Sequence, residues 1–177
     1  MIAARTRAPL RGWRAVHVPT TLLVTNDFPP RVGGIQRTLD ALVAQFPPDR
    51  IGVFCPSQDD AGPYDAALSY RVFRQPEPFL WPTPDVGHRV EVAARELGAE
   101  VVLFGATYPL ALLGPRLVSA GLPYMSAAHG FEYWLSIAPG THALMRRATG
   151  RASRAAGRGG ATRRSRPRPG APRRSPP

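Results

Sequence analysis

The sequence predicts an α/β fold built on a parallel β-sheet. Short apolar runs of strand type recur five times between Thr21 and Ala127. Between several of these runs, apolar residues recur at the three- and four-residue spacing of an amphipathic helix. Strands that alternate with helices of about ten to fifteen residues are typical of βαβ units, whose strands run parallel.

The first half of this region is predicted to begin with a strand, a loop and a helix. Thr21–Thr25 is an apolar run of buried-strand type, and a loop rich in turn residues follows it to Gly34. A helix then begins near Ile35 and is stopped by the prolines at 47 and 48. The next elements are a strand at 50–55, a loop at 56–64 and a third, half-exposed strand at 70–74.

The second half is predicted to begin with an extended segment, because prolines stand at 76, 78, 82 and 84. An apolar stripe at helical spacing then runs from Val86 to Leu97, and Gly98 closes it. The remaining elements are a strand at 100–104, a helix from Pro109 to Gly121, a strand at 123–127 and a last helix that starts near Ala138.

The composition of the chain changes abruptly after Met145. From Arg146 to Pro177 it uses only Arg, Gly, Pro, Ala, Ser and Thr, without an acidic residue. None of these side chains buries enough apolar area to build a packed layer. We therefore predict a folded domain over residues 20–149, a disordered Arg/Pro/Gly/Ala-rich tail over 150–177 and a disordered N-terminal extension over 1–19.

The formal net charge of +11 lies entirely in this tail. All acidic residues of the chain precede Arg146, where they balance an equal number of arginines. A neutral body lacks the basic surface that binds a phosphate backbone, so no specific nucleic-acid partner is expected.

The remaining composition indicates a cytoplasmic protein. The one cysteine, Cys55, ends an apolar run, as a reduced, buried thiol does. No apolar stretch approaches the roughly twenty residues of a membrane-spanning helix. The first twenty residues contain arginines but no apolar core of a signal peptide.

Two loops hold the residues that point to chemistry, because ligands of open parallel sheets bind beyond the carboxyl ends of the strands. The first loop ends in Gly33-Gly34, directly before a helix. Two glycines let a ligand approach the backbone closely, and the helix N-terminus favours an anion such as a phosphate. They would equally serve a tight turn, and the spacing matches neither G-x-G-x-x-G nor a Walker motif, so both interpretations stay open.

The second loop, Ala128–Glu132, follows the last predicted strand. The imidazole of His129 can donate to a sugar hydroxyl or transfer a proton near neutral pH, although a lone histidine at a strand end is more often structural. Glu132 is either its charge partner or a solvated carboxylate. In the first loop, Asn26 and Asp27 either bind ligand hydroxyls or open a turn.

These loops resemble segments of a known enzyme family. Leu22–Gln36, with its Asn-Asp-Phe-Pro-Pro-Arg-Val-Gly-Gly core, is similar to the opening of family 4 retaining glycosyltransferases of the GT-B fold. Ser126–Glu132 is similar to their His-Gly-x-Glu segment. The resemblance covers about residues 20–150. Within the family it is strongest to actinobacterial mannosyltransferases that build phosphatidylinositol mannosides from GDP-mannose.

The resemblance implies a Rossmann-like parallel sheet, the N-terminal half of a GT-B fold, that serves the acceptor side of a mannosyl transfer. It implies two partners, a nucleotide sugar and a lipid-linked sugar acceptor, and neither a cofactor nor a metal. The site residues that it implies are Gly33 and Gly34 at the donor diphosphate, Gln36 at the acceptor head group and the catalytic His129 at the transferred sugar. From the residues themselves we add Asn26 and Asp27 as acceptor-binding candidates, and Gly130 and Glu132 as further candidates beside His129.

In this family a second domain supplies the Arg, the Lys and the acidic residue that bind the donor. This chain contains no lysine, and its composition changes where the family would enter that domain. We therefore expect an inactive fragment, and we hypothesise a reading-frame shift near residues 146–154. The alternative is a lone Rossmann-like binding module whose basic tail binds polyanions, although the tail has no aromatic residue to stack on bases. A nucleotide-binding oxidoreductase would need G-x-G-x-x-G after the first strand.

Phe79-Leu80-Trp81 forms an apolar triplet inside the Pro-rich segment, with Arg71 and Arg74 nearby in sequence. Tryptophan and arginine together suit peripheral docking on an anionic leaflet, here the inner face of the plasma membrane. The same triplet could instead pack under its loop as a satellite of the core.

Overall fold

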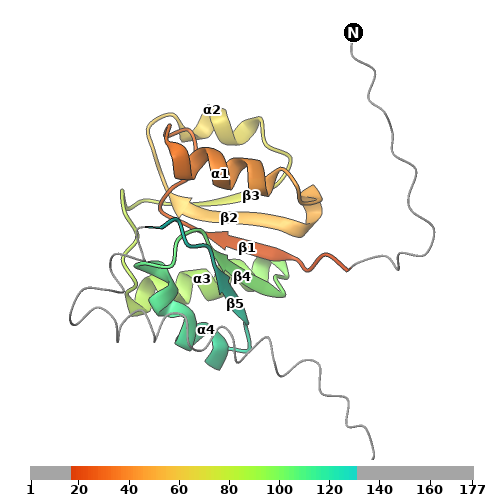
Figure 1. Ribbon diagram of the computed structural model, residues 1–177, viewed down its shortest axis with the longest axis vertical. Coiled ribbons are helices and arrows are strands. Elements are labelled where there is room, and N and C mark those ends of the chain that lie inside the picture. The colour runs from red at the N-terminus through yellow and green to blue at the C-terminus, as the bar shows by residue number, and fades with distance from the viewer. Residues whose placement is uncertain (1–16, 131–177) are drawn as a thin grey trace, which may run out of the picture.

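Five short segments pair into one parallel sheet in the computed structural model, which describes residues 17–130 (Figure 1). The strands are β1 (Thr21–Val24), β2 (Ile51–Pro56), β3 (Arg71–Gln75), β4 (Val101–Phe104) and β5 (Tyr124–Ser126). Their order across the sheet is β3-β2-β1-β4-β5, and every neighbouring pair is parallel. The predicted α/β fold is confirmed.

Helices cover both faces of the sheet (Figure 1). They are α1 (Gly34–Val43) and α2 (Ala61–Ala66) on one face, α3 (Pro84–Leu97) and α4 (Gly114–Ser119) on the other, and the short 3-10 helices η1 (Pro48–Arg50) and η2 (Leu110–Leu113). Successive strand residues point to opposite faces. Leu22 and Val24 of β1 therefore join the core under α3 and α4, whereas Leu23 joins the core under α1.

Burial falls from the centre of the sheet to its edge. Every residue of β1 and β2 is buried, as strands covered on both faces must be. β3 forms an edge of the sheet and is only partly buried, which confirms its predicted half-exposure. Arg71, its first residue, is exposed.

The direction in which successive strands are added to the sheet reverses at β1. The chain first moves to one side, from β1 to β2 and then β3, and afterwards crosses through α3 to β4 on the other side. Val24 of β1 lies beside Phe54 of β2 and Phe104 of β4. Loops diverge where the strand order reverses, so the carboxyl ends of β1 and β4 border the crevice in which open sheets bind ligands.

Two predicted elements were wrong. The predicted loop 56–64 contains the start of α2, which is held by Ala61 in the core and by Tyr64, whose ring meets Phe28 edge-on at 6.4 Å. The predicted helix 109–121 is divided into η2 and α4. Gly114 is the first residue of α4 and packs against the ring of Tyr124, where a side chain would overlap.

Other predictions fall wholly or mostly outside the described residues. The helix near residue 138 and the tail over 150–177 lie beyond residue 130. The N-terminal extension is described only from His17, whose Nε2 lies 2.9 Å from Glu100 Oε2. Helix α1 ends at Val43, a few residues before the prolines expected to stop it.

Candidate functional site

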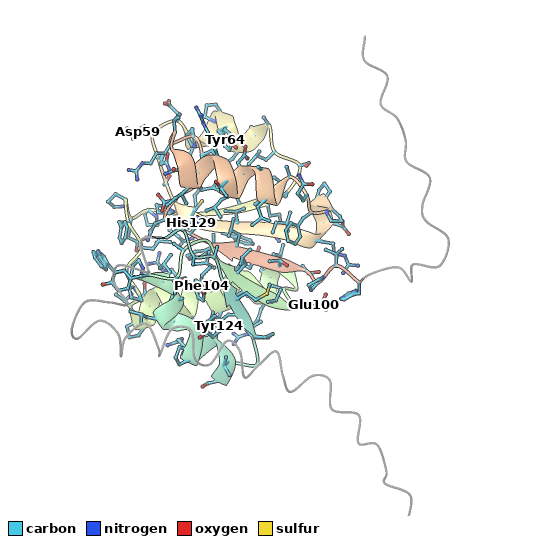
Figure 2. The ribbon with its side chains drawn as sticks, in the orientation of Figure 1. Asp59, Tyr64, Glu100, Phe104, Tyr124 and His129 are labelled. Carbon is cyan, nitrogen blue, oxygen red and sulfur yellow. The ribbon has the colours of Figure 1, made fainter. Side chains whose placement is uncertain are left out.

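The loops after β1, β4 and β5 meet at the carboxyl edge of the sheet. Figure 2 shows His129 toward this edge and Glu100 toward the opposite one. The residues brought together come from three loops: Thr25–Asp27 after β1, Gly105–Thr107 after β4 and Ala127–Gly130 after β5. The parallel sheet thus joins the two sequence-predicted loops, which are about a hundred residues apart in the chain.

The Gly33-Gly34 pair has two distinct roles in this geometry. Gln36 is 7% exposed, and its Nε2 donates to Asp27 Oδ1 at 2.9 Å. A methyl group on Gly33 would overlap Gln36 Oε1, so the Gln36 side chain would have to shift and its contact with Asp27 would be disturbed. Gly34 is exposed, and a methyl group there would meet nothing within 4 Å. The open N-terminus of α1 is therefore at Gly34.

His129 is hydrogen-bonded to the loop after β4. Its Nε2 lies 2.5 Å from the carbonyl oxygen of Gly105. A carbonyl only accepts, so Nε2 carries the proton in this contact. Gly105 is itself packed tightly, because a methyl group there would come within 2.8 Å of Thr25 and Leu39. The hydrogen bond to Gly105 therefore holds the imidazole close to the end of β1 and to α1.

The residues on either side of His129 differ in what the structure says of them. Gly130 has a φ of +91°, a left-handed conformation that glycine adopts without strain. Glu132, the predicted charge partner or solvated carboxylate, lies outside the described residues.

Asn26 anchors a loop through its side chain. Its Nδ2 donates to the carbonyl of Leu80 at 3.1 Å, and its Oδ1 accepts from the amide N–H of Leu80 at 2.7 Å. Both ends of the amide are therefore engaged with backbone. Asn26 therefore has a structural role in this loop, and its contact with an acceptor stays a prediction.

Only part of the predicted membrane triplet is exposed. Leu80 is fully buried in the core beside α3, so its assignment as a membrane contact was wrong. Phe79 and Trp81 are 38% and 58% exposed, and their ring centroids lie 4.9 Å apart. Exposed and buried side chains thus alternate along this segment. Leu80, the middle residue, points inward, and the two aromatic rings stay outside.

The two arginines near this triplet in sequence have other partners. Arg74 is partly buried, donates to both carboxylate oxygens of Asp65 and reaches the carbonyl of Pro29 at 2.7 Å. Arg71 stands at the amino end of β3 and pairs with Glu96. Neither arginine therefore supplies charge to the aromatic pair.

Two cavities lie along the carboxyl edge. The smaller, about 70 Å³, sits at the strand reversal and is bordered by Asn26, Asp27, Phe79, Ala106 and Tyr108. The larger, about 470 Å³, lies between the loops after β1, β2 and β3. The larger one has the size of a small-ligand pocket, whereas the smaller one does not.

Sequence reasoning missed part of this edge. Thr107 is 2% exposed, and its hydroxyl lies 3.2 Å from both Ser126 Oγ and the carbonyl oxygen of Ala127, which joins the loops after β4 and β5. Gln58, in the predicted loop after β2, ties that loop to the loop after β1. The available signal was small and polar residues directly after a buried strand, as in Gly105-Ala106-Thr107.

Within residues 17–130 there is no group of three or more His, Cys, Asp or Glu side chains placed to hold a metal ion. In the same part of the chain, no helix combines the length and the apolar character needed to cross a bilayer.

A parallel sheet with helices on both faces and a reversal of strand order at β1 defines a Rossmann-like domain. No protein-family model matches the chain. Curated mannosyltransferases do match it, which confirms the resemblance found in the sequence.

The chain is 41% identical over 130 residues to the GDP-mannose-dependent monoacylated alpha-(1-6)-phosphatidylinositol monomannoside mannosyltransferase of Corynebacterium glutamicum. This match covers 72% of this chain and 34% of that protein. It is 42% identical over 131 residues to the GDP-mannose-dependent alpha-(1-6)-phosphatidylinositol monomannoside mannosyltransferase of Mycolicibacterium smegmatis, and 40% over 133 residues to that of Mycobacterium tuberculosis. Each of these two matches covers 71% of this chain and 34% of the relative.

By sequence, then, this chain resembles a glycosyltransferase of the mannosyltransferase class. It spans about a third of the length of the curated relatives that it matches. The alternative of a lone binding module with a polyanion-binding tail is not favoured, because these relatives are all named mannosyltransferases. The Rossmann-like sheet fits one half of a GT-B fold.

Proposed function

We propose that the carboxyl edge of this domain is the acceptor side of a mannosyl-transfer site. The reaction would move mannose from GDP-mannose to a phosphatidylinositol-mannoside-type lipid with retention of configuration. The observation that supports it best is the meeting of Gly34, the Asp27–Gln36 pair and His129 at one strand reversal, in a chain about 40% identical to mannosyltransferases.

Each group at this edge has a chemistry that suits the proposal. The open N-terminus of α1 at Gly34 favours the donor diphosphate, because its backbone N–H groups and the helix dipole attract an anion. Asp27 borders the small cavity, where its carboxylate would accept a hydrogen bond from an acceptor hydroxyl. Gln36 holds that carboxylate in place.

His129 is proposed to contact the transferred sugar. The hydrogen bond from Nε2 to the Gly105 carbonyl holds the ring at this edge, where the sugar would lie. The diphosphate that leaves the sugar needs positive charge, and the chain has no lysine to supply it. This chain matches only 34% of the length of the Corynebacterium glutamicum relative. We therefore expect that charge to come from the part of the enzyme that this chain does not match. No metal or cofactor is proposed.

Complementation tests this proposal. The 177-residue chain alone is expected to give no mannose transfer, because each missing preorganised charge costs on the order of 3 kcal/mol of transition-state stabilisation. Adding the separately expressed remainder of the Corynebacterium glutamicum relative should restore turnover. His129→Ala should then lower that turnover about a hundredfold, whereas His88→Ala, on the exposed side of α3, should not. Transfer by the chain alone that survives His129→Ala would refute the assignment.

We also infer that the domain contacts the inner face of the plasma membrane through Phe79 and Trp81. The pair is exposed while its loop is held rigidly, because Leu80 is buried and Asn26 holds the Leu80 backbone. An aromatic pair of this kind suits the interface between headgroups and acyl chains.

Vesicle flotation tests this contact. With vesicles that contain phosphatidylinositol, Trp81→Ser should reduce the bound fraction several-fold. Val92→Ser is the matched control, since Val92 is 45% exposed on α3. Equal loss in both variants, or in neither, would remove the aromatic pair from the proposal.

A further inference from the structure

The cavity of about 470 Å³ at the carboxyl edge has no part in the proposal above. It lies between the loops after β1, β2 and β3. Its volume falls within the range of small-ligand sites, roughly 300 to 1,000 Å³. Polar side chains border it from two loops, and the prolines at 30 and 78 add apolar wall.

The walls of this cavity are held by hydrogen bonds from two partly buried side chains. Gln58 accepts from the Arg31 amide N–H at 2.9 Å and donates to the Phe28 carbonyl at 3.0 Å. Arg74 donates to the carbonyls of Pro29 and Pro56, at 2.7 and 3.0 Å. The loops after β1 and β2 are thus cross-linked, so the cavity is formed before any ligand arrives and little ordering entropy is lost on binding.

The groups at the rim are exposed and unpaired within the described residues. Arg31, Asp59 and Asp60 border the cavity, and none of the three is in an ion pair inside residues 17–130. Figure 2 shows Asp59 at the tip of the loop after β2. Carboxylates accept hydrogen bonds from hydroxyls, and a guanidinium donates to them. Together with proline faces for the apolar side of a ring, this set suits a hexopyranose.

The position of the cavity relates it to the proposed transfer site. Along the strand order, His129 follows β5, the small cavity borders β1 and β4, and the large cavity borders β1, β2 and β3. Asn26 borders both cavities. Because neighbouring strands lie about 4.8 Å apart, the step from β5 to β2 is roughly 14 Å. That span leaves room for the transferred sugar, the acceptor ring and one substituent on that ring.

We propose that the large cavity is a subsite for a mannosyl residue that the acceptor already carries. The proposal rests on the proposed function, and the curated relatives are named for a monomannoside acceptor. Asp59 and Asp60 accept hydrogen bonds from the hydroxyls of this residue, Arg31 donates to them, and Pro30 and Pro78 contact its ring. The subsite would let the protein select an acceptor that bears one mannose over bare phosphatidylinositol.

A nuclear magnetic resonance titration tests the subsite on the 177-residue chain. The probe is methyl α-D-mannopyranoside, which lacks both nucleotide and lipid. We expect its amide shift changes to centre on residues 57–60 and Arg31. Asp59→Asn with Asp60→Asn should raise the apparent Kd at least fivefold. Both side chains are exposed and neither caps α2 through its side chain, so the fold should persist. Asp49→Asn, an exposed carboxylate at the amino edge, is the control.

The results separate this subsite from the proposed function. Shift changes that are absent, that centre elsewhere, or that are equal in the double variant and the wild type would overturn the subsite. If such a result accompanies mannose transfer in the complementation assay, the function stands without the subsite. If the double variant loses mannoside binding while complementation gives no transfer, the cavity is a sugar site and the proposed function fails. GDP-mannose that competes with the mannoside at residues 57–60 would assign the cavity to the donor and overturn the proposal.

Discussion

Alanine in place of Gly33 would put a methyl group where the Gln36 side-chain amide lies. The amide is 7% exposed and bound to Asp27, so it cannot simply turn into solvent without breaking that bond. A hydrogen bond to a charged group contributes about 1.5–3 kcal/mol. Alanine also restricts the unfolded chain, which returns about 0.4–1 kcal/mol. We expect a net loss of about 1.5 kcal/mol in the free energy of unfolding.

Gly34→Ala is the matched control, one residue further along. Its methyl group meets nothing within 4 Å, and the residue already has helical backbone. The loss of unfolded-state entropy should therefore stabilise the chain by about 0.4–1 kcal/mol. Because about 1 kcal/mol shifts the melting temperature of a domain near this size by roughly 4 °C, Gly33→Ala should melt about 6 °C lower and Gly34→Ala slightly higher than the wild type.

Thermal unfolding followed by far-ultraviolet circular dichroism measures both variants. Urea unfolding gives the free energies independently. Opposite signs at the two neighbouring glycines are the expected result. If both variants melt at the same temperature, the Gln36–Asp27 contact does not decide the identity of residue 33, and the reasoning is refuted.

Two further predictions concern the core and its ion pairs. Glu91→Gln should lower the free energy of unfolding by about 1–2 kcal/mol in urea, because the glutamine oxygen can still accept from Arg116 Nε but the charge of the 7%-exposed carboxylate is lost. Glu96→Gln, with both partners exposed, should change it by less than about 0.5 kcal/mol. Burial raises the pKa of the Cys55 thiol from 9.0 to about 12, so the native thiol should react very slowly with Ellman's reagent at pH 8. Below pH 9 the thiol is protonated in the folded and the unfolded chain, whereas between pH 9 and 12 only the unfolded chain ionises. The thiol's contribution to stability should therefore fall as the pH rises through that window. Fast labelling of the folded chain, or an identical pH profile of stability in Cys55→Ala, would contradict this.

The sequence alone determined the elements whose evidence is local. β1, β2 and β4 are apolar runs long enough to be recognised, and α3 has both a Pro at its first turn and Gly98 with a φ of +69° at its end. The loops after buried strands could likewise be marked as binding loops, because parallel sheets place such loops at one edge. The motifs around Gly33-Gly34 and His129 were sufficient to indicate the mannosyltransferase resemblance.

Only the tertiary structure decided the roles of individual side chains at that edge. Whether Leu80 turns inward depends on the space under α3, and whether Asn26 meets a ligand depends on the backbone of a loop about fifty residues away. Local patterns carry no information about such partners. The short α2 was missed for the same reason, since its place is set by the contact of Tyr64 with Phe28. Spacing in the chain predicted which loops meet, and packing across the sheet decided which side chains stay available to a ligand.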